Sequence, residues 1–143
     1  MQLLGLLWAG KDVKQLQARL DYLLALQRAD GGWSQTPGLV SDAYATGQVL
    51  FTLHAMGVST MAPTGSASSS DRAYQRGVEH LLRTVLDDGS WHVVSRAVKF
   101  QPYFQSGFPH DHDQWISSAG TAWATIGLAY AVDKLSGAKE EAK

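Results

Sequence analysis

A four-residue motif, Asp-Gly-x-Trp, occurs twice in this sequence, and its tryptophans, Trp33 and Trp91, lie 58 positions apart. A ring-bearing residue and leucines precede both copies at matching distances. A repeat of this length is typical of chains that stack one supersecondary unit on the next. The motif residues are Tyr22, Gln27, Asp30, Gly31 and Trp33 in the first copy, and His80, Asp88, Gly89 and Trp91 in the second. The chain is therefore expected to consist of repeated hairpins.

Four segments have the apolar spacing of helices. Residues 13–27 and 71–85 carry charged side chains on one side, whereas residues 42–56 and 117–135 are apolar around most of the helix. Ser70 is positioned to cap the third of these helices. Because amphipathic helices alternate with apolar ones, the predicted fold class is all-α, built from α/α hairpins.

Each Asp-Gly-x-Trp motif lies where an amphipathic helix is expected to end. Glycine adopts the left-handed conformation that terminates a helix, and aspartate accepts hydrogen bonds from nearby backbone amides in turns. The tryptophan ring can pack between hairpins while its indole N–H reaches a backbone carbonyl. We therefore interpret Trp33 and Trp91 as structural clasps rather than as catalytic residues.

The apolar helices match at a larger offset of 75 positions, because residues 45–47 correspond to residues 120–122. The second hairpin thus has an insertion between its tryptophan and its apolar helix, and the start of the chain resembles the end of a further apolar helix. The expected organisation is a single domain, 1–143, of about two and a half hairpins. Its parts are the end of an incomplete hairpin (1–10), hairpin one (11–57), a linker (58–70), hairpin two (71–135) with a long loop (92–115), and a charged tail (136–143).

Composition excludes several classes of partner. With 143 residues, 45% of them hydrophobic, and a net charge of −1, the chain is expected to be a soluble globular domain. Basic residues do not cluster, so no nucleic-acid partner is expected. The apolar run 3–9 is too short for a transmembrane segment, and the chain contains no cysteine. No cofactor is predicted, and the compartment stays open between the cytoplasm and a peripheral location on a membrane.

The pattern Tyr-Leu-x3-Gln-x3-Gly-x-Trp over residues 22–33 resembles the QW motif of squalene-hopene cyclases and oxidosqualene cyclases. Residues 76–91 fit the same motif, with His80 in the aromatic position and Val85 in the glutamine position. The chain thus resembles the squalene cyclase and prenyltransferase repeat superfamily over most of residues 13–134. The resemblance implies the C-terminal portion of an α/α toroid, in which outer helices join inner helices around a central cavity. This chain would supply less than half of such a ring.

The catalytic residues of that superfamily do not carry over to this chain. Class II terpene cyclases protonate their substrate with an Asp-x-Asp-Asp motif just before a Thr-Ala pair, but residues 117–120, before Thr121, contain no acid. Residues 42–45, before Thr46, do not form the motif either. The zinc site of the prenyltransferases needs a cysteine, which is absent. If the chain acts in an enzyme, that enzyme is expected to be terpene-cyclase-like and to require a larger chain or assembly.

The insertion at 92–115 is rich in aromatic residues, and Pro102 and Pro109 favour an ordered loop there. Two interpretations stay open. The rings contact an apolar substrate, where each would stabilise a carbocation by about 0.5–2 kcal/mol, or they pack the loop onto the helix ends. The candidate substrate-binding residues are Phe100, Tyr103, Phe104, Phe108, Trp115 and, on the following helix, Trp123.

His110, Asp111, His112 and Asp113 form the most polar stretch of this loop. Imidazole and carboxylate groups suit a metal ion, but two histidines leave the ligand set incomplete, so no metal is predicted. A protonated carboxyl group of Asp111 or Asp113, with its histidine neighbours, is a candidate general acid. The plainer interpretation is hydrogen bonding at the start of the next helix, where Asp113 suits a helix N-terminus.

Two functions are compatible with these observations. As part of a terpenoid cyclase, the chain would help to enclose an apolar, isoprenoid-type substrate, with the missing hairpins supplied by a longer parent chain, another subunit or self-association. As a non-catalytic repeat module, it would bind a protein or a lipid-like ligand. The absent acid motif favours the second function, and the aromatic insertion favours the first.

Overall fold

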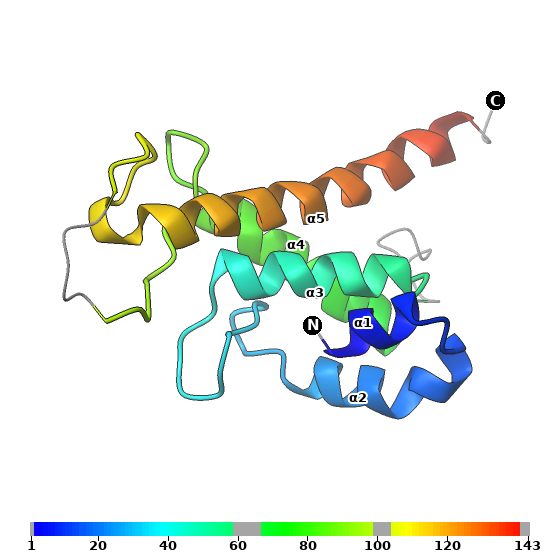
Figure 1. Ribbon diagram of the computed structural model, residues 1–143. Coiled ribbons are helices and arrows are strands. Elements are labelled where there is room, and N and C mark those ends of the chain that lie inside the picture. The colour runs from blue at the N-terminus through cyan, green and yellow to red at the C-terminus, as the bar shows by residue number, and fades with distance from the viewer. Residues whose placement is uncertain (1, 59–66, 99–103, 141–143) are drawn as a thin grey trace.

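The computed structural model describes residues 2–58, 67–98 and 104–140, and every regular element in these ranges is helical (Figure 1). The predicted all-α fold class is therefore confirmed. Phe100 and Tyr103, and most of the expected linker 58–70, lie outside the described residues. The elements are α1 (Gln2–Trp8), the 3-10 helix η1 (Val13–Leu16), α2 (Gln17–Ala25), α3 (Ala43–Ala55), α4 (Ser69–Thr84), the 3-10 helix η2 (Asp111–Asp113) and α5 (Gln114–Glu140).

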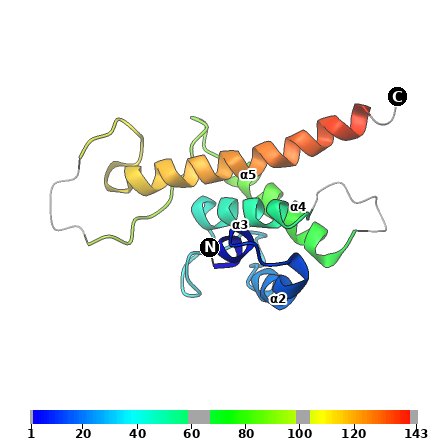
Figure 2. The ribbon, with the colours of Figure 1, turned by 45° about the vertical axis from the view of Figure 1, so that its right-hand side comes forward.

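The apolar helices lie side by side, with α3 between α1 and α5, while α4 packs against both α3 and α5 (Figures 1 and 2). Glycine permits the close approach of α3 and α5, because a Cβ atom on Gly47 would lie 2.6 Å from the backbone nitrogen of Ala124. The more polar α2 lies on the outside, below α3 in Figure 1. Of the helices in the described ranges, none is both long and apolar enough to cross a membrane.

The core lies where α3 meets α4 and α5. Leu50 and Leu53 of α3 are completely buried, and Tyr74 of α4 is 1% exposed. The Tyr74 hydroxyl donates a hydrogen bond to the backbone oxygen of Gly127 at 3.4 Å. Burial disfavours the phenolate and raises the pKa of Tyr74 to about 12.

The ends of two helices differ from the sequence-based expectation. Ser68, and not Ser70, caps α4, because the Ser68 hydroxyl accepts from the backbone N–H of Asp71 while the Asp71 carboxylate accepts from the backbone N–H of Ser68. Helix α5 begins at Gln114, because η2 leads directly into it, so the long loop ends before residue 115. The same helix continues to Glu140, through the expected tail, where alanine, lysine and glutamate are good helix formers.

Candidate functional site

The first Asp-Gly-x-Trp turn joins the end of α2 to the start of α3. Gly31 has a φ of +87°, a left-handed conformation that suits glycine. The Asp30 carboxylate accepts a hydrogen bond from the backbone N–H two residues later at 3.0 Å. The backbone N–H of Trp33 donates to the Thr46 hydroxyl at 3.0 Å, and the indole N–H donates to the Leu23 backbone oxygen at 2.9 Å. The buried tryptophan therefore bonds to both helices of the hairpin.

The second turn has the same hydrogen bonds at equivalent positions. Gly89 has a φ of +80°, and the Asp88 carboxylate accepts from the backbone N–H two residues later at 2.9 Å. The backbone N–H of Trp91 donates to the Thr121 hydroxyl at 3.0 Å, and the indole N–H donates to the Leu81 backbone oxygen at 3.0 Å. The partners are shifted by the two offsets found in the sequence, 58 positions at Leu81 and 75 positions at Thr121. The two hairpins are therefore structural repeats.

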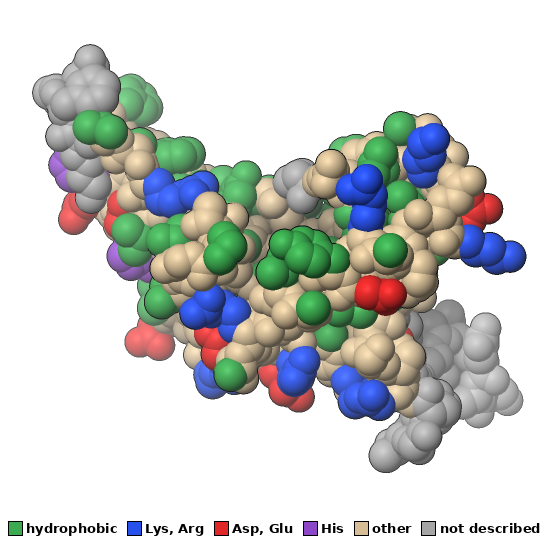
Figure 3. All heavy atoms as spheres, turned by 90° about the horizontal axis from the view of Figure 1, so that it is seen from below, with side chains coloured by type: hydrophobic (Ala, Val, Ile, Leu, Met, Phe, Trp, Pro, Cys, Tyr) green, Lys and Arg blue, Asp and Glu red, His purple; other side chains and the backbone are tan. Residues whose placement is uncertain are grey.

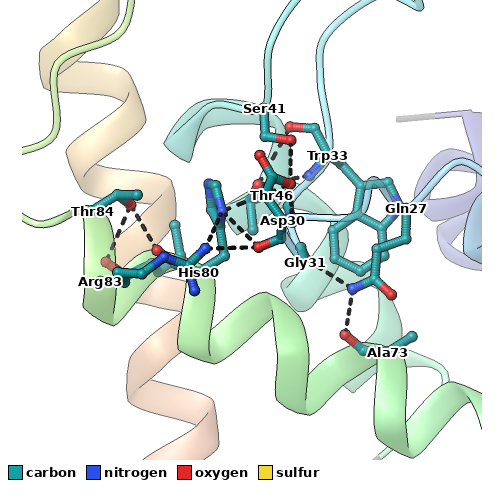
Figure 4. Close-up of polar contacts among 12 residues, drawn as sticks. Gln27, Asp30, Gly31, Trp33, Ser41, Thr46, Ala73, His80, Arg83 and Thr84 are labelled. Atoms are coloured by element: carbon teal, nitrogen blue, oxygen red, sulfur yellow. Dashed lines mark hydrogen bonds and ion pairs between the residues drawn. The ribbon is translucent and has the colours of Figure 1, made fainter.

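Helix α4 covers the first turn and bonds to it (Figure 4). The Gln27 side-chain amide donates to the Gly31 backbone oxygen at 2.8 Å and to the Ala73 backbone oxygen, on α4, at 2.7 Å. The Arg83 guanidinium, also on α4, donates to the Asp30 backbone oxygen at 2.8 Å. The first motif thus fastens its own hairpin to the next one.

The carboxyl group of Asp30 has a lowered pKa. Burial acts to raise the pKa, but hydrogen bonds from the Gly32 backbone N–H and the Ser41 hydroxyl, together with the nearby His80 and Arg28, lower it by more. His80 Nδ1 lies 3.9 Å from the Asp30 carboxylate. The pKa of Asp88 is also lowered, chiefly by its hydrogen bonds from Ser90.

The second turn has no covering helix in the part of the chain that the structure describes. A Cβ atom on Gly89 would have no neighbour within 4 Å. Val85 occupies the position of Gln27 and is 38% exposed. Leu82 nearby is 59% exposed. The surface that α4 covers in the first hairpin is therefore apolar and exposed in the second.

Helix α5 is exposed where the equivalent part of α3 is covered. Leu50 of α3 is completely buried, and the position 75 residues later, Thr125, is exposed. Its neighbour Ile126 is 39% exposed. Exposed residues shifted by 58 or 75 positions from ones that the next hairpin contacts in the first repeat form one surface. It is named the open face and consists of Leu82, Val85, Gly89, Ala122, Thr125 and Ile126.

The polar residues of the long loop hold it against the second turn. His92 Nε2 lies 2.8 Å from the Asp113 carboxylate. His110 Nε2 lies 3.0 Å from the Ser90 hydroxyl oxygen. The rings of His92 and His110 stack, with their centroids 4.7 Å apart. Sequence analysis did not identify His92 and Ser90 as partners, because residues 20 positions apart in a loop have no fixed periodicity.

The candidate acids Asp111 and Asp113 border a shallow pocket of about 340 Å³ with the neighbouring histidines His92, His110 and His112. Asp111 is exposed, and Asp113 accepts hydrogen bonds from His92 and from the Ser95 backbone N–H at 2.9 Å.

A general acid of this kind needs a desolvated carboxyl group, whereas Asp111 lies exposed at the surface. Within residues 2–58, 67–98 and 104–140, no three or more histidine, aspartate or glutamate side chains are placed to hold a metal ion.

The described aromatic candidates do not gather at one place. Phe104 and Trp115 are 87% and 53% exposed. Phe108 is half-buried and meets the His110 ring edge to face, with centroids 6.4 Å apart. Trp123, on α5, instead packs against another part of the molecule. The loop rings that the structure describes thus lie at or near the surface.

Trp123 belongs to an aromatic cluster that crosses all three apolar helices. The Phe51 ring of α3 lies 5.8 Å from Trp123 and 5.7 Å from Tyr130, both on α5, and 6.3 Å from Trp8 of α1. Trp8 is 67% exposed. Sequence analysis missed Trp8, Phe51 and Tyr130 as a group, although the seven-residue spacing of Trp123 and Tyr130 places them on one face of a helix.

The comparisons with known proteins agree with this repeat structure. The family model described as the squalene-hopene cyclase C-terminal domain matches residues 1–113, which include both Asp-Gly-x-Trp turns and helices α1 to α4. No curated protein and no solved structure matches the chain.

Proposed function

The chain belongs to the squalene-hopene cyclase C-terminal domain family, and we propose that it is one section of an α/α toroid that encloses an apolar, isoprenoid-type molecule. Further hairpins of the same kind complete the toroid, from a longer parent chain, another subunit or a second copy. The catalytic acid, where the toroid is an enzyme, lies on another section. The observation that carries this proposal is the open face, which repeats a covered surface and is itself uncovered.

The chemistry of the open face supports a hairpin as its occupant. The equivalent surface of the first hairpin receives α4, whose Tyr74 and Leu81 are buried in the contact between the hairpins. Exposed apolar residues at matching positions, such as Leu82 and Ile126, favour burial against a similar helix pair. The aromatic cluster supplies the ligand-contacting surface, because only the apolar helices contribute to it and one of its rings, Trp8, is largely exposed.

A second function, a non-catalytic module that binds a lipid-like ligand or a protein, is favoured by the state of the loop carboxylates. Asp113 already accepts two hydrogen bonds, and Asp111 is exposed. Neither is arranged as a desolvated acid within this chain. In this case the toroid binds its ligand without converting it.

Squalene binding tests the proposal together with the oligomeric state. The chain is expected to associate with increasing concentration, and squalene is expected to elute with the associated form in size-exclusion chromatography with light scattering. Replacing Leu82 and Ile126 with lysine on the open face keeps the chain monomeric and free of squalene. Val40→Lys, at a site that is 76% exposed in the loop before α3, is the matched control and retains both properties. A chain that binds squalene equally well as a monomer contradicts the proposal, and a chain that is monomeric at every concentration excludes a second copy as the source of the missing hairpins.

A further inference from the structure

A cavity of about 560 Å³ lies on the α2 side of the molecule, between the end of α2, residues 34–37 and the first half of α3. Its volume is that of small-molecule binding sites. It shares no residue with the open face or with the aromatic cluster. Its apolar walls are formed by Leu3, Leu23, Leu26, Trp33, Pro37 and Val49.

The amide side chain of one largely buried residue lines this cavity. Gln48 of α3 is 8% exposed, and its side chain makes no hydrogen bond to any residue that the structure describes. Its neighbours Gln35 and Thr52, which also line the cavity, are hydrogen-bonded to Asp42 and to the backbone of α3. The polar atoms of the Gln48 side chain stay accessible at the cavity wall. Gln48 therefore offers hydrogen bonds that a molecule in the cavity can accept or donate.

The charged residues that line the cavity are both arginines. Arg28 follows α2, and Arg96 comes from the loop after the second turn, so two separate segments bring positive charge to one place. The only hydrogen bond of the Arg28 side chain to the described residues is a long one, 3.5 Å, to the Pro37 backbone oxygen. Asp30 lies near Arg28, but neither it nor any other acidic residue occurs among the described residues that line the cavity. Guanidinium groups recognise carboxylates and phosphates.

The surface around the cavity has the same character. Figure 3 views the molecule from below, the side on which Figure 1 shows α2, and on this face hydrophobic side chains lie among Lys and Arg side chains, with Asp and Glu side chains also present. A cavity with apolar walls and two arginines suits a molecule that has a long apolar part and one anionic end. A pure hydrocarbon would offer no hydrogen bond to Gln48 and no opposite charge to the two arginines.

We propose that this cavity binds one anionic amphiphile. Its carboxylate or phosphate head lies between Arg28 and Arg96, the Gln48 amide donates to an oxygen near the head, and its hydrocarbon chain lies along Leu23 and Val49. This site goes beyond the proposed toroid, because it is contained within one chain and does not require the open face to be covered.

Titration with three ligands that share one hydrocarbon chain tests the proposal. Oleate, oleyl phosphate and oleyl alcohol are each titrated into the unmodified chain below their critical micelle concentrations, with calorimetry as the readout. Each anion is expected to bind at one molecule per chain and at least about ten-fold more tightly than the alcohol. The carboxylate and phosphate arms distinguish the two kinds of head group, and a preference for either one supports the site.

Variants connect the preference to the cavity. In Arg28→Gln with Arg96→Gln, the anions and the alcohol are expected to bind within about two-fold of each other. The matched control, Lys11→Gln with Lys14→Gln, removes the same charge from exposed positions at and before η1 and keeps the full preference. Gln48→Met, which replaces the amide by an apolar side chain of similar shape, is expected to weaken anion binding while the melting temperature stays the same or rises. That combination separates a ligand-binding role of Gln48 from a structural one.

Equal binding of anion and alcohol, or a double arginine variant that behaves like the lysine control, overturns the proposal. Absence of binding by all three ligands also overturns the proposal, and would favour a helix of another polypeptide as the occupant of the cavity. The variant with lysine at positions 82 and 126 separates this site from the toroid, because it is expected to lose squalene and to bind oleate like the unmodified chain. Loss of oleate binding in that variant also contradicts a site within one chain.

Discussion

At the first Asp-Gly-x-Trp turn, α4 of the following hairpin covers the motif, whereas the equivalent surface of the second turn is exposed. The hydrogen bonds inside the two turns are the same, with Trp33 and Trp91 each bonded to a backbone oxygen of the preceding helix and to a threonine of the next. The motif therefore fixes the geometry of the turn without help from a neighbour. The contribution of each motif residue to stability depends on whether a helix of the following hairpin covers the turn.

The glutamine position shows this division. Gln27 donates to the Ala73 backbone oxygen on α4 and accepts a hydrogen bond from Arg76. Its equivalent, Val85, faces no such helix in the described part of the chain and is 38% exposed. Because no helix covers this position in the described part of the chain, the valine loses no hydrogen bond of the kind that Gln27 makes to α4. The presence of valine instead of glutamine in the second motif thus agrees with the absence of a covering helix among the described residues.

Removal of a clasp tryptophan is expected to have the largest effect. Trp33→Ala and Trp91→Ala each leave a large cavity and should lower the free energy of unfolding by about 3–5 kcal/mol. Trp33 should be near the upper end, because its ring also packs against α4, where a Cβ atom on Gly77 would lie 2.9 Å from it. Urea unfolding followed by circular dichroism measures both values. Equal losses would mean that the covering helix adds nothing, and an unchanged transition in either variant would refute the clasp.

The two motif glycines differ in their surroundings and not in their backbone. Gly31→Ala and Gly89→Ala both place a Cβ atom in the left-handed region, at about 1–2 kcal/mol. At Gly31 that atom would also lie 2.6 Å from the Arg76 backbone oxygen, whereas at Gly89 it meets nothing within 4 Å. Overpacking adds about 1–3 kcal/mol at Gly31 alone. The difference between the two melting temperatures checks this, and a Gly89 variant as unstable as the Gly31 variant would indicate a cover over the second turn.

Exchange of the residues at the glutamine position should have a smaller and one-sided effect. Gln27→Val leaves two backbone oxygens and Arg76 without their partner, and is expected to cost about 1–2 kcal/mol. Val85→Gln adds an amide at an exposed site and should change stability by less than about 0.5 kcal/mol. Chemical denaturation of the two single variants tests the asymmetry. A Val85→Gln variant that is clearly stabilised would show that a carbonyl partner exists for the second motif.

The sequence was sufficient for the features that depend on local spacing. The fold class and the family follow from the repeat at Trp33 and Trp91 and are confirmed. The start of α3 was predicted to within one residue, because Asp42, given as the first helical residue, is the N-cap. The cap of α4 was assigned to Ser70 rather than Ser68, since a run of three serines offers the same hydroxyl at successive positions.

Features that depend on packing between distant segments were not predictable in the same way. The stacking of His92 on His110 joins positions with no common periodicity. The cavity around Gln48 requires α2, α3 and the loop that carries Arg96 to meet. The insertion predicted a cluster of loop aromatics, yet Phe104 is exposed, and the cluster that joins the apolar helices lies around Phe51. A side chain's neighbours across hairpins are set by helix packing, which residue spacing within one segment does not contain.

Acid titration should give the smallest difference between the two turns. Both Asp30 and Asp88 have pKa values below their ordinary value of 3.8. A lowered pKa in the folded state means that the unfolded chain binds more protons, so the stability from these carboxylates is present above pH 3.8 and is lost as the pH falls through their folded pKa values. Carbon-detected NMR of the two carboxyl groups is expected to place both titrations below that of an unfolded aspartate.

The cause of the shift differs between the turns, and one substitution separates them. At Asp30 the His80 side chain of α4 contributes to the lowered pKa, whereas at Asp88 the hydrogen bonds from Ser90 dominate. His80→Gln should therefore raise the pKa of Asp30 and leave that of Asp88 unchanged. The variant should also lose less unfolding free energy as the pH falls, because the pKa values of Asp30 in the folded and unfolded chain would differ by less. If Asp30 titrates unchanged in this variant, α4 covers the turn by packing alone and its histidine has no electrostatic role there.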